Sequence, residues 1–358
     1  MKKATAAIVI LGIIAIIAYK QWQSHKLGPA GSALELKGAV GGEKMALMED
    51  PQIVEILKSR YQVWPRPEKS GSIEMVRRPP GDRTFLFPGS QLATEIFKTN
   101  PGAKAAESQT VLRSPVVIYS WDHTAQALIK EGIVQQINNA YYIVDLPKLV
   151  KLIVSGRTWA ELGLPYYGKI LVTTTDPSYS NSGMMFAGLM ANMLVGNNEV
   201  ADERNIEPHL ATIRTFFARL GFMERSSSDL FEAYLTTGEG AKPLVVGYEN
   251  QMIEYALQKP ALWNQSKDKV RVLYPMPTCW SSHELIALNE SSRALIRALL
   301  DEEVQKLAWE RHGFRSGSSG VVTAPQILSG VTVPENLDQI VPLPNYRTME
   351  KILGTLQQ

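Results

Sequence analysis

The sequence predicts an α/β fold of two domains that follows an apolar N-terminal segment. Strand-like and helix-like segments alternate from residue 33 onward, which is typical of mostly parallel sheets covered by helices. A chain of 358 residues with 45% apolar side chains can bury a sizeable core, and its length favours two domains over one. One expected strand, SPVVIYSW, is strongly apolar and rich in β-branched residues, as buried strands are. These three observations predict the fold class.

The first 32 residues are predicted to be a membrane signal anchor and a linker. Lys2 and Lys3 precede the uncharged run ATAAIVILGIIAIIAY, whose sixteen residues reach about 24 Å as a helix. A cleaved signal peptide is the alternative, although no cleavage site with small residues follows the run directly. SHKLGPAGSA has the composition of a flexible linker. Both interpretations place the bulk of the chain outside the cytoplasm, and the first makes it a single-pass membrane protein.

Apolar β-branched runs predict the strands, and apolar residues recurring every three or four positions predict the helices. Ile53, Ile56 and Leu57 share a helix face in this way, and Gly132 and Gly156 follow helix patterns where a glycine commonly ends a helix. In chain order, strands are expected at residues 33–40, 72–76, 84–88, 114–121, 168–175, 242–250, 269–275 and 283–289. Helices are expected at residues 45–62, 90–99, 123–132, 146–156, 183–196, 206–221, 251–258 and 291–314. Beyond residue 315 the chain is rich in Gly, Ser and Pro, and an irregular segment is expected.

The charge and the cysteine content of the chain exclude several classes of function. The chain has 37 Lys and Arg against 35 Asp and Glu, and four of the lysines lie in the first 26 residues. The remainder is therefore slightly acidic and is not expected to bind nucleic acid. The single cysteine, Cys279, excludes a disulfide framework within the chain and is expected to be a small buried side chain. The five histidines lack metal-ligand spacing, so no metal and no cofactor is expected.

Four polar loops lead from an expected strand into an expected helix. In open α/β sheets, ligands bind beyond the carboxyl ends of strands, where such loops lie. Free N–H groups at a helix start attract anions, glycine lets the backbone approach a ligand, and hydroxyls donate to its oxygens. The candidate residues are Gly42, Glu43 and Lys44 in GAVGGEKM, Ser90 in FPGSQLA, Ser120 and Trp121 in YSWDHTA, and Ser178, Ser180, Asn181 and Ser182 in TTTDPSYSNSG. KSGS at 69–72 and GYEN at 247–250, with Tyr248, are weaker candidates of the same kind.

Each loop also has a purely structural interpretation. Ser90 and Ser182 are residue types that cap helices for stability alone, and Trp121 beside a strand end is as often part of a core. A solvated position is the default for Lys44, and Asp176 is expected to shape its turn. Four loops of one type in one chain nevertheless favour a shared ligand site.

The sequence gives little support to catalysis. It contains no G-x-S-x-G, G-x-x-x-x-G-K-[ST] or G-x-G-x-x-G motif, so no enzyme is expected. An enzyme on a borrowed fold, with Cys279, Asp176 or His123 in a catalytic role, remains an alternative.

Two stretches resemble the bacterial extracellular solute-binding proteins of the type 2 periplasmic-binding fold, the group that includes the sulfate and molybdate receptors of ABC transporters. EEVQKLAWERHGF is similar to the closing helix of this family. KLVKLIVSGRTWAELGLPYYGKILVTTTDPSYSNSG resembles its second-domain stretch, with a W..LG turn before the strand and ligand loop. The resemblance covers roughly residues 33 to 320.

The resemblance implies two Rossmann-like lobes, with mixed, mostly parallel sheets, that are joined by a two-segment hinge and close on a ligand. Lobe 1 would comprise 33–118 plus 272–345 and lobe 2 would comprise 119–271, with 346–358 as a C-terminal tail. The ligand would contact the loop residues named above, together with Tyr248. A retained anchor and the charged first loop depart from a simple oxyanion receptor.

The expected function is a membrane-anchored extracytoplasmic solute-binding protein that takes a small polar or anionic solute and serves a membrane permease. The alternative is a sensor or interaction module of the cell envelope that binds another envelope protein. The retained anchor favours this alternative.

Overall fold

The computed structural model describes residues 33–196, 199–317, 327–328 and 330–357. The predicted signal anchor and linker at residues 1–32 lie outside the described residues. In the part of the chain that is described, none of the helices has the length and apolar character that a membrane crossing requires.

The strands form a mixed sheet in which two groups share the long strand β4 (Glu107–Trp121). The first group consists of β1 (Leu34–Val40), β2 (Val63–Lys69), β3 (Phe85–Phe87), β9 (Trp280–Ala287) and β10 (Arg315–Ser316). The second group consists of β5 (Val134–Ile137), β6 (Ala140–Ile143), β7 (Leu244–Tyr248) and β8 (Val270–Pro275). A separate hairpin pairs β11 (Ile327–Leu328) with β12 (Val331–Thr332).

The pairing is parallel for β1 with β2 and β3 and for β6 with β8, and antiparallel elsewhere. The first part of β4 pairs with β9, whereas Val116 to Trp121 pairs with β7 and β8. The chain returns from β8 to β9 through residues 276–279. Two neighbouring segments therefore connect the two strand groups.

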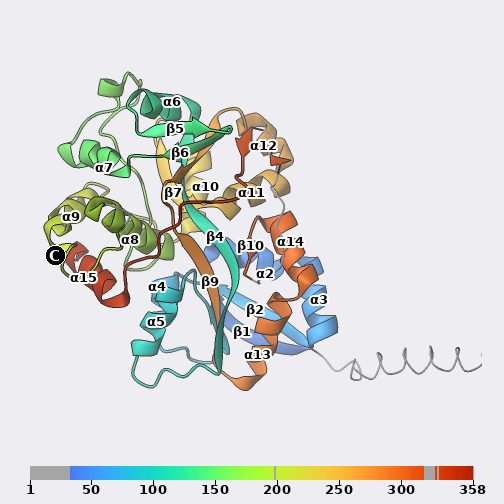
Figure 1. Cartoon of the computed structure of the whole chain (residues 1–358). Helices are drawn as coiled ribbons and strands as arrows, with labels where there is room; N and C mark the ends of the chain where they lie inside the picture. Colours follow the sequence, from blue (N-terminus) through green and yellow to red (C-terminus); the bar gives the residue numbers. More distant parts are fainter. Residues whose placement is uncertain (1–32, 197–198, 318–326, 329, 358) are drawn as a thin grey trace, which may run out of the picture.

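We call the first strand group with its helices lobe 1 and the second lobe 2. The helices of lobe 1 are α2 (Met45–Glu49), α3 (Pro51–Tyr61), α4 (Ser72–Arg77), α5 (Gln91–Thr99), α13 (Arg293–Leu299) and α14 (Glu302–His312). The helices of lobe 2 are α6 (Asp122–Lys130), α7 (Leu146–Ser155), α8 (Asn181–Val195), α9 (Leu210–Ala218), α10 (Ser227–Thr237), α11 (Glu249–Gln258) and α12 (Pro260–Ser266). Short 3-10 turns occupy η1 (Gly42–Lys44), η2 (Ala160–Leu162), η3 (Glu207–His209) and η4 (Glu290–Ser292). Lobe 2 forms the upper half of Figure 1 and lobe 1 the lower half, with β4 running through the centre.

Side-chain caps fix several helix starts. Asp50 accepts hydrogen bonds from the backbone N–H of Gln52 and Ile53 at the start of α3. Ser90 accepts one from Ala93 at the start of α5. Such caps satisfy N–H groups that have no partner within the helix. Ser90 therefore has the structural role expected of its residue type, whatever else it does.

The sequence-based assignments differ from the structure at several places, and β2, β5, β6, α10 and α12 were not predicted. Residues 72–76 were expected as a strand but form α4, because a short apolar run does not by itself separate a strand from a buried helix. Residues 168–175 are extended but make isolated bridges, from Lys169 to Thr158 and from Thr173 to Val245, rather than a strand. The helix expected at 291–314 is two helices, and Asp301 caps the second. The helix expected at 45–62 is likewise divided at Asp50.

The C-terminal tail is also more regular than expected. It contains α15 (Tyr346–Leu356), which packs on α8 and α9 of lobe 2 and approaches α5 of lobe 1. Its Glu350 pairs with Arg77 of α4 at 2.8 Å, so α15 contacts both lobes.

Candidate ligand cleft

A small, closed cleft lies between the two lobes, where strand ends and helix starts converge. Its volume is about 10 Å³, which is room for about one water molecule. From lobe 1 it is lined by Gly41, Gly42, Glu43, Ser70, Gly71 and Ser72, and from lobe 2 by Ser180, Asn181, Arg225, Ser226, Ser227 and Tyr248. Small and hydroxyl side chains therefore predominate on both walls.

Most of the predicted ligand residues lie in or beside this cleft. Three of them do not line it but contact a side chain that does: Lys44 contacts Glu43, Ser90 donates to Asn181 at 2.6 Å, and Ser182 lies 3.3 Å from the hydroxyl of Ser180. Those that line the cleft themselves are Gly42, Glu43, Ser180, Asn181 and Tyr248.

The structure does not bring Ser120 and Trp121 to the cleft. Ser120 donates to the carbonyl of Pro243 at 3.3 Å, and the indole of Trp121 donates to the carbonyl of Lys242 at 3.0 Å. β4 runs antiparallel to β7, so Val116 lies opposite Tyr248 while Ser120 lies four residues further into lobe 2. The two strands therefore end at opposite edges, and the end of β4 belongs to the core of lobe 2.

Ser178 also lies outside the lining of the cleft. Its backbone N–H donates to Asp176 at 2.8 Å, within the turn that precedes α8. Asp176 thus shapes this turn, as expected. The loop contributes Ser180 and Asn181 to the cleft, whereas Ser178 lines a pocket on another face together with Arg214 and Arg219.

Hydrogen bonds cross the cleft directly from one lobe to the other. The carbonyl oxygen of Tyr179 accepts from the backbone N–H of Ile73 at 3.1 Å and of Glu74 at 3.4 Å, at the start of α4. Ser227 of lobe 2 donates to the carboxylate of Glu43 at 3.4 Å. The Tyr179 carbonyl and the Glu43 carboxylate therefore accept hydrogen bonds from N–H and O–H groups that could otherwise donate to a solute.

Gly71 permits the closest of these approaches, and replacing it with alanine is expected to separate the lobes. A Cβ there would lie 2.4 Å from the carbonyl oxygen of Tyr179. We expect a larger radius of gyration in small-angle X-ray scattering and a loss of about 1 to 3 kcal/mol in the free energy of unfolding. Gly240→Ala is the control, since a Cβ at Gly240 meets open space. An unchanged radius of gyration in Gly71→Ala would contradict this close contact.

Glu43, Lys44 and His283 form a buried polar cluster at the lobe 1 side of the cleft. The ammonium group of Lys44 contacts the carboxylate of Glu43 and lies 3.1 Å from Nδ1 of His283. It also lies 4.9 Å from the centre of the Phe87 ring. Lys44 and His283 are fully buried, and Glu43 is 6% exposed. The expected solvated position of Lys44 is wrong, because η1 turns its side chain inward beneath the cleft.

Burial and neighbouring charges shift the pKa values in this cluster. Burial alone would raise the pKa of Glu43, but the charge of Lys44 and the contact with His283 outweigh it and hold that pKa well below its usual range. Burial lowers the pKa of Lys44, and Glu43 opposes this effect. Burial, together with the charge of Lys44, lowers the pKa of His283 to about 4. At neutral pH, Glu43 is therefore a carboxylate and His283 is uncharged.

Several cleft residues were not predicted from the sequence. Arg225, Ser226 and Ser227 lie at the start of α10, where the hydroxyl-rich stretch ERSSSD was an available signal of the same type. Arg225 stacks over the ring of Tyr179 at 4.0 Å and is a cationic side chain in the lining. His283 lies 239 positions after Lys44, and no local pattern of residues indicates that the two side chains meet.

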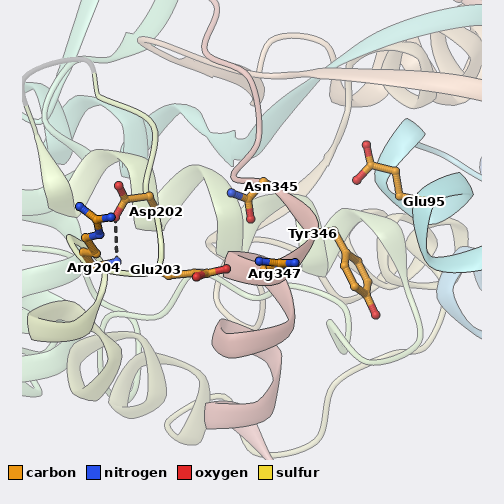
Figure 2. Close-up of a pocket in the computed structure, with 7 residues that line it drawn as sticks. All are labelled: Glu95, Asp202, Glu203, Arg204, Asn345, Tyr346 and Arg347. Carbon is orange, nitrogen blue, oxygen red and sulfur yellow. Dashed lines mark hydrogen bonds between the residues drawn. The ribbon is translucent and has the colours of Figure 1, made fainter. Parts of the chain in front are cut away.

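A larger cavity of about 680 Å³ lies elsewhere, where lobe 1, lobe 2 and α15 meet (Figure 2). It is lined by Glu95, Asp202, Glu203, Arg204, Asn345, Tyr346 and Arg347. Its charges are mixed, and none of the residues predicted from the loops lines it.

Cys279 and His123, two of the three residues considered for a catalytic role, are not arranged as a catalytic site. Burial raises the pKa of the Cys279 thiol to about 12, which disfavours the reactive thiolate. His123 is an exposed side chain that pairs with Glu239 at 3.2 Å. Within the described residues, no group of three or more His, Cys, Asp or Glu side chains could hold a metal ion.

Solved structures share this architecture across most of the chain. The sulfate-binding protein SubI from Mycobacterium tuberculosis H37Rv matches over 89% of this chain and 96% of its own, with 14% identity and a TM-score of 0.54. The periplasmic binding protein AfuA from Actinobacillus pleuropneumoniae, with exogenous fructose-6-phosphate bound, matches over 89% and 96%, with 12% identity and a TM-score of 0.56. A two-component system protein that mediates signal transduction matches over 90% and 100%, with 13% identity and a TM-score of 0.54.

No protein-family model matches the sequence, and neither does any curated protein. At identities of 12 to 14% the likeness concerns the fold and says nothing of the ligand. The resemblance predicted from the sequence is confirmed at this level. The chain has the α/β fold of the periplasmic and extracellular solute-binding proteins.

Proposed function

We propose that this chain is an extracytoplasmic solute-binding protein that closes its two lobes on a small polar or anionic solute. The observation that carries the proposal is the cleft itself, to which both lobes contribute helix starts, hydroxyls and glycines. Such groups bind oxyanions through N–H and O–H donors and need few cationic side chains. Arg225 adds one positive charge to the lining.

We further propose that the solute is passed to an ABC-type permease and that residues 1–32 hold the protein at the membrane. The fold supports the first part of this proposal, since SubI and AfuA are binding proteins of this architecture. The apolar run near the N-terminus supports the second.

Titration calorimetry on the purified full-length protein tests the binding function. The panel comprises sulfate, molybdate, phosphate and fructose-6-phosphate, and we expect at least one to give heat and to raise the Tm. Two serines of one loop provide a matched pair of variants. Ser180→Ala removes a hydroxyl from the cleft and is expected to weaken binding about tenfold, or about 1.4 kcal/mol, whereas Ser178→Ala is expected to leave it unchanged. The absence of heat and of a Tm shift for every solute would count against the proposal.

A sensor or interaction module of the cell envelope is the second candidate. The observation that favours it is the direct closure of the lobes on each other, which leaves a volume of about 10 Å³ in the cleft. A module of this kind needs no solute to close. Calorimetry separates the two functions, because both are closed without solute: a solute receptor is expected to give heat with at least one solute of the panel, and the module is expected to give none.

A further inference from the structure

The carboxylate of Glu43 is held as a bound anion would be held, by groups from both lobes. Lys44 of lobe 1 contacts one carboxylate oxygen, and Ser227 of lobe 2 donates to the other at 3.4 Å. The carboxylate is buried and belongs to the lining of the cleft. A side chain of the protein therefore makes the cross-lobe contacts that closure on an external anion would require.

Gly41 allows the charged pair to fold back against the backbone. A Cβ at Gly41 would lie 2.6 and 2.7 Å from the two carboxylate oxygens of Glu43 and 2.8 Å from the ammonium nitrogen of Lys44. A side chain at position 41 would thus compete for the same space. The pair is packed into a place that the glycine leaves open.

Because the hydrogen bonds of Ser281 and His283 are consistent with a neutral imidazole, Lys44 is the counter-charge of Glu43 in this cluster. Ser281 donates its hydroxyl hydrogen to the carbonyl of Gly89 at 2.6 Å, so its oxygen can accept from Nε2 of His283 at 3.4 Å. Nδ1 of His283 lies 3.1 Å from Lys44 and 3.5 Å from the Glu43 carboxylate, and in this tautomer it accepts from Lys44. With a neutral imidazole, Glu43 and Lys44 balance each other, and the cluster carries no net charge.

We propose that the Glu43 carboxylate is the resident anion of the cleft and that an anionic solute binds by replacing it beside Lys44. This inference rests on the proposed function, because it names the position and the charge class of the solute. Glu43 then determines selectivity. An incoming anion has to compete with a tethered carboxylate, and a neutral solute gains nothing from the ammonium group.

The test is chemical rescue of Glu43→Ala by acetate. The substitution removes a CH2–COO group, which acetate matches in size and charge, and leaves Lys44 buried without its partner. We expect the Tm of the variant to fall by about 5 °C and to regain at least half of this loss in acetate. Formate is expected to restore less, and butyrate, which is too long for the space, is expected to restore none.

Matched variants separate rescue from a general effect of salt. Glu43→Gln keeps the volume filled and is expected to gain no more from acetate than from chloride. Glu43→Ala combined with Lys44→Met removes the ammonium group and is expected to lose the rescue. In the wild-type protein the Glu43 carboxylate already fills this space, so acetate and chloride are expected to change its Tm equally.

If acetate and chloride raise the Tm of Glu43→Ala by the same amount, the inference is overturned. If this variant is insoluble, refolding from urea is compared in the two salts: recovery in acetate alone supports the inference, and recovery in neither overturns it. This outcome is independent of the solute panel, because acetate fills a space that the substitution creates. Wild-type protein that binds none of the panel while Glu43→Ala is rescued would contradict the solute-binding function and leave the resident anion supported.

Discussion

Replacing Arg315 with leucine is expected to lower the free energy of unfolding by about 3 to 5 kcal/mol. Arg315 of lobe 1 makes a bidentate pair with Glu249 at the start of α11 in lobe 2, with distances of 2.7 and 3.0 Å. Glu249 is 1% exposed, and Tyr274 is its other hydrogen-bond donor at 2.9 Å. The variant leaves a buried carboxylate without its counter-charge, and this is the source of the cost. Urea unfolding at neutral pH measures it.

Two further variants test the cause of this loss. Arg157→Leu breaks an exposed ion pair with Glu161 and is expected to cost less than about 1 kcal/mol. Adding Glu249→Leu to Arg315→Leu removes the unpaired charge and is expected to recover part of the loss. If Arg315→Leu costs no more than Arg157→Leu, the buried pair does not stabilise the contact between the lobes.

Acidification from pH 7 to pH 4.5 is expected to destabilise the protein through His283 by about 2.5 kcal/mol. Burial, together with the charge of Lys44, lowers the pKa of His283 to about 4 from an ordinary value of 6.5. The unfolded chain therefore binds more protons than the folded one between these two values. The contribution of the neutral imidazole is complete above pH 6.5 and is lost as the pH falls towards 4.

The measurement compares urea unfolding at pH 7 and pH 4.5 in wild-type protein and in His283→Gln. The loss of unfolding free energy between pH 7 and pH 4.5 is expected to be about 2.5 kcal/mol smaller in the variant, because glutamine at position 283 does not titrate. His123→Gln, at an exposed side chain, is expected to behave as wild type. The same pH dependence in His283→Gln and wild type would show that His283 is not the group responsible.

The pattern of alternating elements predicted the fold class because each element has a local signal. The runs that became β7 and the second half of β4 are apolar and rich in β-branched residues, and the glycine that ends α7 lies where the sequence pattern predicted it. Errors arose where the local signal is shared by two structures. The run SIEMV buries Ile73, Met75 and Val76 from a helix as well as it would from a strand.

The candidate cleft was predictable in part, because some of its residues also have a local signal in the sequence. Hydroxyls at helix starts are visible in sequence, so Ser180 and Asn181 could be named before the fold was known. Strand direction is not visible locally, and the antiparallel pairing of β4 therefore placed Ser120 away from the cleft. The partners of charged residues were also hidden, since Glu249 and Arg315 are separated by 66 positions.

The position of α15 has a consequence for how the chain folds. Residues 181 to 192 of α8 are all buried, and α8 bears apolar side chains on every face. Gly188 of α8 lies where a Cβ would be 3.0 Å from Leu343 and from Met349 of α15. A chain still under synthesis therefore exposes methionine-rich surface on α8 until α15 has been made. α15 covers this surface and completes the core of lobe 2, so a chain that lacks α15 is left with a surface prone to aggregation.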